Sequence, residues 1–311
     1  MAQGNSRVIA SRVSVIIVTR NRRDDVIECI SSVMKSKYPG EIEVVVVDNG
    51  STDNTETAVR SKFPEVSFDY NPSNLGLVGG RNRGQSMAHG EYLVFLDSDT
   101  TVDETMIFHL EELASRKGVG IVAPKMYSYR EPERLWFAGA TLNLLNSRAN
   151  NTGAWEIDTG KYERVTEISH GPTCFIVRKE LADLIKGHDP VFFQSYADTD
   201  FAFRVKKLGY LNLYCPTAVL YHKTPTLERN DSLRGLGMDS PLRAYFYARN
   251  KTLFMKRHSP QLNFIAFVTV FMPLINVMYL HRIAKYGGGS KYLSQYLLGI
   301  KNGFEFIFRR L

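Results

Sequence analysis

The sequence predicts an α/β fold with a doubly wound, mostly parallel sheet, and three observations support this. Two apolar runs, residues 13–18 and 42–47, are too continuously hydrophobic for a sheet with one solvated face. Each run is followed by a polar turn and then by an expected helix, the first of which has apolar residues at helical spacing. Strand–loop–helix units in series require right-handed crossovers between parallel strands. Ligands of such sheets bind beyond the carboxyl ends of the strands, so we expect the functional residues there.

The first half of the chain continues this alternation. Asp24 and Asp25 favour the start of the first helix, and Pro39-Gly40 separates it from the second strand. Acidic and polar residues likewise follow the second apolar run, which ends in Asp48. The elements expected up to residue 124 are a strand 13–18, a helix 24–34, a strand 42–47, a helix 55–61, strands 66–70 and 93–96, a helix 104–116 and a strand 119–124.

Length and composition fit an ordinary globular protein. The 311 residues are 44% apolar and 23% charged, which is enough for a sizeable core. Three cysteines lie far apart with no CxxC spacing, which argues against a disulfide framework or a zinc site and favours a reducing, cytosolic setting. The N-terminus lacks the apolar core of a secretory signal.

Two acids, Asp97 and Asp99, follow the apolar run 93–96. Carboxylates this close repel each other and contribute nothing to a hydrophobic core. They are the hard oxygen ligands that Mg²⁺ or Mn²⁺ prefers, so the pair indicates a metal site. The structural alternative is a turn in which Asp99 or Thr100 caps the helix that starts near Asp103.

Residues 74–84 form a glycine-rich segment that carries Arg81 and Arg83 where a helix is expected to begin. Glycines permit close backbone approach, and a helix N-terminus with arginines suits a diphosphate. The segment is neither a Walker loop nor the glycine fingerprint that follows the first strand of dinucleotide-binding proteins. A glycine-rich turn with solvated arginines is the structural alternative.

The second half contains two further polar positions of interest. A helical stripe of Phe201, Val205 and Leu208 places Asp198 and Asp200 at the start of a helix. A carboxylate fixed there can act as a general base, or it can simply cap the helix. The apolar strand 218–222 ends in His222, which fits either a ligand or a hydrogen-bonded structural residue. The irregular, aromatic residues 125–165 suit either an acceptor pocket or a β-hairpin on the sheet.

In this order, residues 15–21, 47–53, 74–84, 95–99 and 198–201, with His222, resemble the inverting family 2 glycosyltransferases of GT-A fold. The later pattern Tyr245–Asn250 is similar to the rhamnosyltransferase-type members, and the resemblance covers about residues 12–255. It implies a metal-dependent transfer of a sugar, with inversion, from a nucleotide-diphosphate sugar to a hydroxyl acceptor. The cofactor would be Mg²⁺ or Mn²⁺.

The resemblance also implies roles on the donor side. Thr19 and Asp48 would contact the nucleotide base, and Arg81 the nucleotide or its diphosphate. Asp97 would reach the ribose side of the donor. The expected division is an N-terminal extension, a nucleotide-sugar-binding half, an acceptor-binding half and basic, hydrophobic C-terminal helices, at residues 1–11, 12–124, 125–240 and 241–311.

For the reacting centre the resemblance implies Asp99 as a metal ligand and His222 as a metal or diphosphate partner. Asp198 would be the general base. The family usually has Glu-Asp where this chain has Ala197-Asp198, which leaves the usual neighbour of the base missing. The chemistry agrees independently, because such a transfer needs a departing diphosphate neutralised and an acceptor hydroxyl deprotonated.

Two other functions compete with this interpretation. A sugar-nucleotide nucleotidyltransferase would need a glycine-rich, basic loop after the first strand, and residues 19–22 contain no glycine. A catalytically inactive, membrane-held subunit that binds nucleotide sugars has Ala197 as its only support.

The charge of the chain is unevenly distributed. From Arg243 onward there are eleven Lys or Arg residues and one acid, Glu305, so this tail has a net charge of +10. Because the whole chain has a net charge of +7, the remainder has a net charge of −3. A basic tail that is also strongly apolar predicts an anionic membrane surface as its partner and not a nucleic acid.

Residues 259–280 contain no Lys, Arg, Asp or Glu, and as a helix they would span about 33 Å at about 1.5 Å per residue. That length suffices for a transmembrane helix, but a crossing would export a basic tail against the positive-inside tendency. Pro273 near the middle favours a bent helix or hairpin in one leaflet, with the enzyme on the cytoplasmic face of the cell membrane. A single span, or helices packed on the protein's own core, are the alternatives. Membrane attachment in turn favours a lipid-linked or cell-surface glycan as acceptor.

Overall fold

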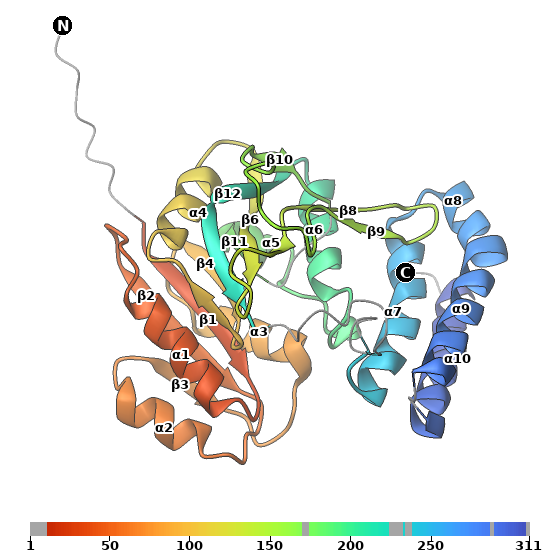
Figure 1. The fold of residues 1–311 in the computed structure, drawn as a ribbon, viewed down its shortest axis with the longest axis horizontal. Helices are drawn as coiled ribbons and strands as arrows, with labels where there is room; N and C mark the ends of the chain where they lie inside the picture. Colours follow the sequence, from red (N-terminus) through yellow and green to blue (C-terminus); the bar gives the residue numbers. More distant parts are fainter. Residues whose placement is uncertain (1–10, 170–173, 224–232, 234–237, 287–288, 309–311) are drawn as a thin grey trace, which may run out of the picture.

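The computed structural model describes residues 11–169, 174–223, 233, 238–286 and 289–308. A ten-stranded sheet forms its centre, with the order β10-β12-β6-β11-β4-β1-β2-β3, while β5 pairs with β12 and β7 with β6 (Figure 1). The strands of this sheet are β1 (Val13–Thr19), β2 (Ile42–Asp48), β3 (Ser67–Tyr70), β4 (Tyr92–Asp97), β5 (Thr100–Val102), β6 (Val119–Ser128), β7 (Leu135–Phe137), β10 (Thr166–Glu167), β11 (Phe175–Arg178) and β12 (Leu211–His222).

The pairing of the strands aligns their polar carboxyl ends. β1 runs parallel to β2 and β4, with Thr19 opposite Asp48 and Val18 opposite Asp97. β11 is inserted antiparallel between β4 and β6, and β12 returns parallel to β6. The sheet is therefore mixed but mostly parallel, as the sequence predicts. The two predicted halves, 12–124 and 125–240, contribute strands to the same sheet.

Helices cover both faces of the sheet, because strand residues alternate between two apolar clusters. Val15 and Ile17 pack with one group of helices, and Ile16, Val45 and Val47 with the other. The first group consists of α1 (Arg23–Met34), α2 (Thr55–Lys62) and α4 (Met106–Ala114). The second consists of α3 (Gly76–Met87), α5 (Lys179–Leu184) and α6 (Ala197–Lys207). This confirms the doubly wound prediction.

The chain after Asp99 differs from the predicted helix start. The short strand β5 comes first and pairs antiparallel with the end of β12, which sets His222 opposite Thr100. α4 begins only at Met106, after a turn in which the Asp103 carboxylate accepts hydrogen bonds from Thr105. A three-residue strand gives too short a pattern to detect, and it forms because β12 offers an edge to pair with.

Residues 125–165 contain hairpin structure. Besides β7, the strands β8 (Ala140–Leu142) and β9 (Ala149–Asn151) form a separate two-stranded sheet. This hairpin extends from the central sheet toward the C-terminal helices (Figure 1), and Leu142 packs in an apolar cluster with Phe254 and Phe264. The hairpin therefore bridges the central sheet and the tail.

The tail consists of α7 (Pro241–His258), α8 (Gln261–Ala266), the π-helical turn η2 (Phe267–Phe271), α9 (Met272–Lys285) and α10 (Gly289–Phe308). α10 packs along α7 and also contacts α9. The continuous helical stretch Gln261–Lys285 has 25 residues, is long and apolar enough to cross a membrane, and is only 17% buried over its most apolar window. Its exposed apolar side chains include Leu262, Leu274 and Val277.

The contact between α7 and α10 depends on two glycines. A Cβ atom at Gly299 would lie 2.3 Å from the backbone oxygen of Tyr245, whereas one at Gly303 would meet Thr252 Oγ1 at 3.1 Å. The first contact is with rigid backbone, and the second is with a side chain that can move.

We therefore expect Gly299→Ala to lower the thermal unfolding temperature of the purified protein in detergent, and Gly303→Ala to leave it unchanged or raise it slightly. Both changes gain about 1 kcal/mol of helix propensity. Overpacking at residue 299 costs about 1–3 kcal/mol and outweighs that gain. Equal melting temperatures for the two variants would show that the helices separate without cost.

Candidate active site

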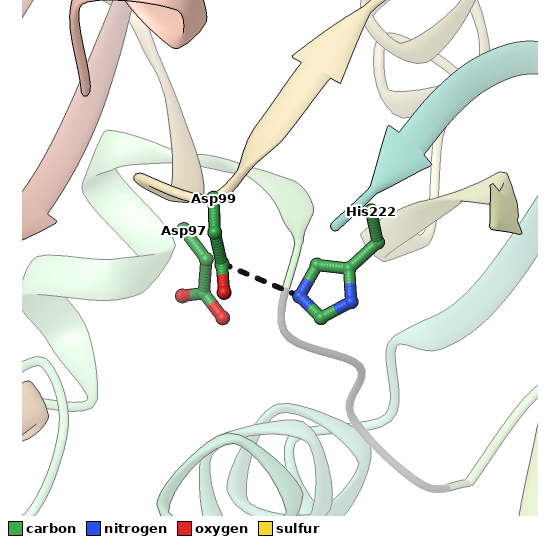
Figure 2. Close-up of side chains that lie close together, drawn as sticks. All are labelled: Asp97, Asp99 and His222. Atoms are coloured by element: carbon green, nitrogen blue, oxygen red, sulfur yellow. Dashed lines mark ion pairs between the residues drawn. The ribbon is translucent and has the colours of Figure 1, made fainter. Parts of the chain in front are cut away.

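Three ligand-type side chains meet at the carboxyl end of the sheet. Asp97 ends β4, Asp99 lies in the turn before β5, and His222 ends β12. Their potential ligand atoms all lie within 4.8 Å of one another. Figure 2 shows the two carboxylates and the imidazole facing a common space, with His222 Nε2 3.4 Å from Asp99 Oδ1.

The electrostatics of this cluster keep Asp99 ionised. Burial alone would raise the pKa of Asp99, but the hydrogen bond from His222 and the charges of His222 and Arg22 outweigh burial and hold this pKa at about 2. Arg22 Nη1 lies 3.1 Å from Asp99 Oδ2. The pKa of Asp97 is raised, because burial and the charge of Asp99 outweigh the charge of Arg81.

These three potential ligands fit a divalent cation such as Mg²⁺ or Mn²⁺. Two carboxylates and an imidazole are suitable ligands, and converging acids are costly without a cation between them. His222 Nδ1 is buried and has no hydrogen-bond partner within the described part of the chain. The ring of Trp136 stacks on His222 with centroids 5.7 Å apart, which fixes the plane of the imidazole. Asp97, Asp99 and His222 are therefore the residues that could hold the ion.

Arg81 connects this cluster to the second half of the chain. It lies on α3, and its side chain is only 1% exposed. Its Nη2 donates to Asp97 Oδ1 at 3.0 Å, and its Nη1 donates to Asp198 Oδ1. Its guanidinium also lies 5.6 Å from the ring centroid of Phe95.

The glycines around Arg81 allow close packing of α3 on the sheet, and their predicted contact with a diphosphate stays a prediction. α3 already begins at Gly76, and a Cβ atom at Gly80 would lie 2.6 Å from Val18, and one at Gly84 2.3 Å from Ile16. The glycines therefore allow the helix to lie directly on β1. Close packing carries Arg81 into the site, while Arg83 stays half-exposed and pairs with Asp69.

Asp198 lies in the first turn of α6, as predicted. Its Oδ1 is contacted by Arg81 and by His188 Nε2, the latter at 3.1 Å. The loop before α6 is held by α7, since Asn250 Nδ2 donates to the carbonyls of Phe192 and Ser195, each at 2.8 Å. The candidate base is thus positioned by three separate helices.

The neighbouring Asp200 has a structural environment. It is fully buried and accepts from Arg204 Nε at 2.7 Å and Arg257 Nη1 at 3.0 Å, and its Oδ1 lies 2.7 Å from His258 Nε2. Burial alone would raise its pKa, but the hydrogen bond with His258 and the arginine charges outweigh it and hold the pKa at about 2. Such a carboxylate joins α6 to α7 and is a poor proton acceptor.

Thr19 and Asp48 lie side by side at the ends of β1 and β2. Both are buried, and Thr19 Oγ1 and Asp48 Oδ2 lack hydrogen-bond partners within the described residues. Burial raises the pKa of Asp48 against the opposing hydrogen bonds from Ser51. Uncompensated polar atoms of this kind suit a ligand that brings its own donors, as a nucleotide base does.

Two residues of the site were missed by sequence analysis. Arg22 and His188 lie in the segments before α1 and η1 (Pro190–Phe192), where no periodicity marks them. For Arg22, the only signal in the sequence was the presence of basic residues in the turn after the first strand. For His188 there was no signal in the sequence.

Comparison with known proteins identifies the family. Residues 14–184, more than half of the chain, match Glycosyl transferase family 2. The chain belongs to glycosyltransferase family 2. Its fold is accordingly GT-A-like, a mixed and mostly parallel sheet to which C-terminal helices are added.

Relatives and solved structures agree with this family. The chain is 27% identical over 180 residues to the glycosyltransferase GlyG of Streptococcus pneumoniae. The aligned region covers 54% of this chain and 57% of GlyG. The chain is 28% identical over 130 residues to the uncharacterised glycosyltransferase YibD of Escherichia coli, covering 40% and 37%. The chain thus spans little more than half the length of the first relative and about a third of the second.

Two solved structures share the fold at low identity. A mannosyltransferase from Pyrobaculum calidifontis in complex with GDP-Man and Mn²⁺ aligns with a TM-score of 0.55 and 14% identity, covering 97% of this chain and 88% of its own. GalNAc-T7 with UDP, GalNAc and Mn²⁺ aligns with a TM-score of 0.62 and 15% identity, covering 96% and 56%.

The cluster leads to a direct test of metal binding. Asp99→Asn should weaken Mn²⁺ binding in the presence of a nucleoside diphosphate by more than the roughly 10–100-fold that loss of an outer-shell partner costs. Free Mn²⁺ can be measured by electron paramagnetic resonance. Asp103→Asn, a matched change in the turn before α4, should bind Mn²⁺ normally. Undiminished binding by the residue 99 variant would remove Asp99 from the metal site.

Proposed function

We propose that this protein is a metal-dependent, inverting glycosyltransferase that moves a sugar from a nucleotide-diphosphate sugar to a hydroxyl group of an acceptor. The observation that carries the proposal is the convergence of Asp97, Asp99, His222, Arg81 and Asp198 at one edge of the sheet. Family membership supports the donor class, since solved proteins of this fold include complexes with GDP-Man and with UDP.

In this proposal, one group of residues binds the nucleotide-sugar donor and one residue acts as the general base. Thr19 and Asp48 would bind the nucleotide base, and Asp97 would bind on the ribose side. A divalent cation held by Asp99 and His222 would neutralise the charge that develops on the departing diphosphate. Arg81 would supply a second, fixed positive charge beside it.

Asp198 would accept the proton of the acceptor hydroxyl as its oxygen attacks the anomeric carbon. The nucleoside diphosphate leaves from the opposite face of the sugar. A single displacement assisted by one general base therefore inverts the configuration at the anomeric carbon. Asp200 is unsuited to this step because it is buried and paired with Arg204, Arg257 and His258. Within the pair of acids on α6, Asp198 is therefore the candidate.

The rhamnosyltransferase-type pattern, residues 245–250, does not indicate which sugar the donor carries. Its residues lie on α7, where Arg249 donates to the Val191 carbonyl and Asn250 to carbonyls of the loop before α6. Arg249 and Asn250 thus hold the loop that precedes the candidate base. The proposal therefore names the donor by its nucleotide diphosphate and not by its sugar.

Replacing the general base, Asp198, tests both the proposed transferase and the alternative of a catalytically inactive subunit. Asp198→Asn should lower turnover by roughly 10²–10⁴-fold, the usual contribution of a positioned base, while donor affinity stays nearly unchanged. Turnover is measured as release of the nucleoside diphosphate, with the exposed Asp24→Asn as control. Wild-type turnover in the residue 198 variant would place the base elsewhere, and a wild-type protein without turnover would favour the inactive subunit.

We also propose that the tail attaches the enzyme to the cytoplasmic membrane surface from one side. Leu262, Leu274 and Val277 leave much of α8 and α9 apolar and exposed, and Arg282 and Lys285 follow at the end of α9. Exposed apolar surface of this kind is typical of lipid contact, and basic residues beside it attract anionic headgroups. A lipid-linked or cell-surface glycan is the acceptor that fits such a location.

The topology can be tested with a cysteine inserted after Arg310. The native thiols, Cys29, Cys174 and Cys215, are buried, so a membrane-impermeant thiol reagent should report on the new one. In intact cells we expect no labelling, and full labelling after permeabilisation. Labelling before permeabilisation would mean that the tail has crossed the membrane.

A further inference from the structure

His188 lies directly behind the candidate base, in the loop between α5 and η1. Its side chain is fully buried, and its Nε2 is 3.1 Å from Asp198 Oδ1. Three aromatic rings surround the imidazole, with centroid distances of 4.9 Å to Phe95, 4.7 Å to Phe201 and 6.2 Å to Phe175.

The surroundings of His188 define which ring nitrogen carries its hydrogen. Burial lowers the pKa of the imidazole more than the hydrogen bond with Asp198 raises it, which favours the neutral form. Ionised Asp198 can only accept a hydrogen bond, so the hydrogen belongs on Nε2. Nδ1 is buried and lacks a partner in the described part of the chain. A phenyl ring would fill the same aromatic pocket without this unpaired nitrogen, so the imidazole is used for its Nε2–H.

The backbone of His188 is fixed independently of its ring. Its N–H donates to Asn82 Oδ1 at 2.8 Å, and Asn82 Nδ2 donates to its carbonyl at 2.7 Å. Gly187 permits this contact, because a Cβ atom there would lie 2.6 Å from Asn82 Oδ1. Asn82 follows Arg81 on α3, so one helix carries Arg81 and also holds the backbone of His188, and each of these two residues contacts Asp198 Oδ1.

The residue beside the base offers no such contact. Ala197 is buried in an apolar cluster with Leu253 and Phe254 of α7 and Phe203 of α6. A carboxylate at this position would enter apolar surroundings, where a charge without a partner is unfavourable. The orientation of Asp198 must therefore be set from another direction.

We propose that His188 is a positioning residue that orients Asp198 through its Nε2–H, in the absence of an acid at residue 197. The proposal rests on the proposed function of Asp198 as the general base. Together with Arg81, His188 fixes the direction in which the carboxylate faces the acceptor hydroxyl. His188 itself touches neither substrate.

The test compares three variants of the full-length protein that differ in the group reaching Asp198. His188→Phe fills the aromatic pocket but has no donor, and His188→Asn has an amide too short to reach the carboxylate. His188→Gln places an amide N–H near the original Nε2. We expect the Phe and Asn variants to lose about tenfold to 100-fold in kcat, as small misplacements of catalytic groups do, with unchanged donor KM. The Gln variant should recover most of this loss.

The outcomes separate this inference from the proposed function. Wild-type kcat in His188→Phe, or equal losses in all three variants with normal donor binding, would overturn the positioning role. Asp198→Asn is assayed in parallel. If that variant keeps its turnover, the assignment of the base fails first, whereas an inactive residue 198 variant with an active Phe variant rejects His188 alone. Binding of the donor, followed by thermal unfolding, shows that each variant is folded.

Discussion

The buried guanidinium of Arg81 is the constraint around which the site is built. A charge that is removed from water must be paired, since an unpaired buried ion costs several kcal/mol, about 3–5 when one partner of a pair is removed. Asp97 from β4 and Asp198 from α6 provide this pairing. The guanidinium therefore ties the strand that ends in the metal cluster to the helix that carries the base. Without it, two acids would face each other in a site that already raises the pKa of Asp97.

Much of this architecture could be predicted from the sequence, because strand ends are visible in it. Continuous apolar runs defined β1, β2 and β4, and the polar residues after them had to meet at one edge. His222 joined the cluster for the same reason, at the end of β12. The contacts of Arg22 and His188 could not be predicted, since they arise where loops from different elements meet. The glycines of α3 were recognised, but their packing on β1 depends on neighbours that lie far apart in the sequence.

The C-terminal helices take part in the geometry of the site as well as in the proposed contact with lipid. Asn250 holds the loop before α6 from one side, and Arg257 bridges Asp189 at 2.8 Å and Asp200 at 3.0 Å. The hairpin of β8 and β9 packs into the same apolar cluster as α8. Residues on both sides of the proposed boundary at 241 thus depend on one another for their conformation.

The buried Asp200 has a consequence for obtaining a soluble fragment. A chain cut before α7 would lose Arg257 and His258, and of the three basic partners of the Asp200 carboxylate described above it would keep only Arg204. A chain cut after Ser259 would keep these partners, but it would uncover the face of α7 against which Gly299 and Gly303 pack. Neither cut is clean. Mild detergent or a lipid nanodisc around the intact chain is therefore the better route to crystals or to cryo-electron microscopy.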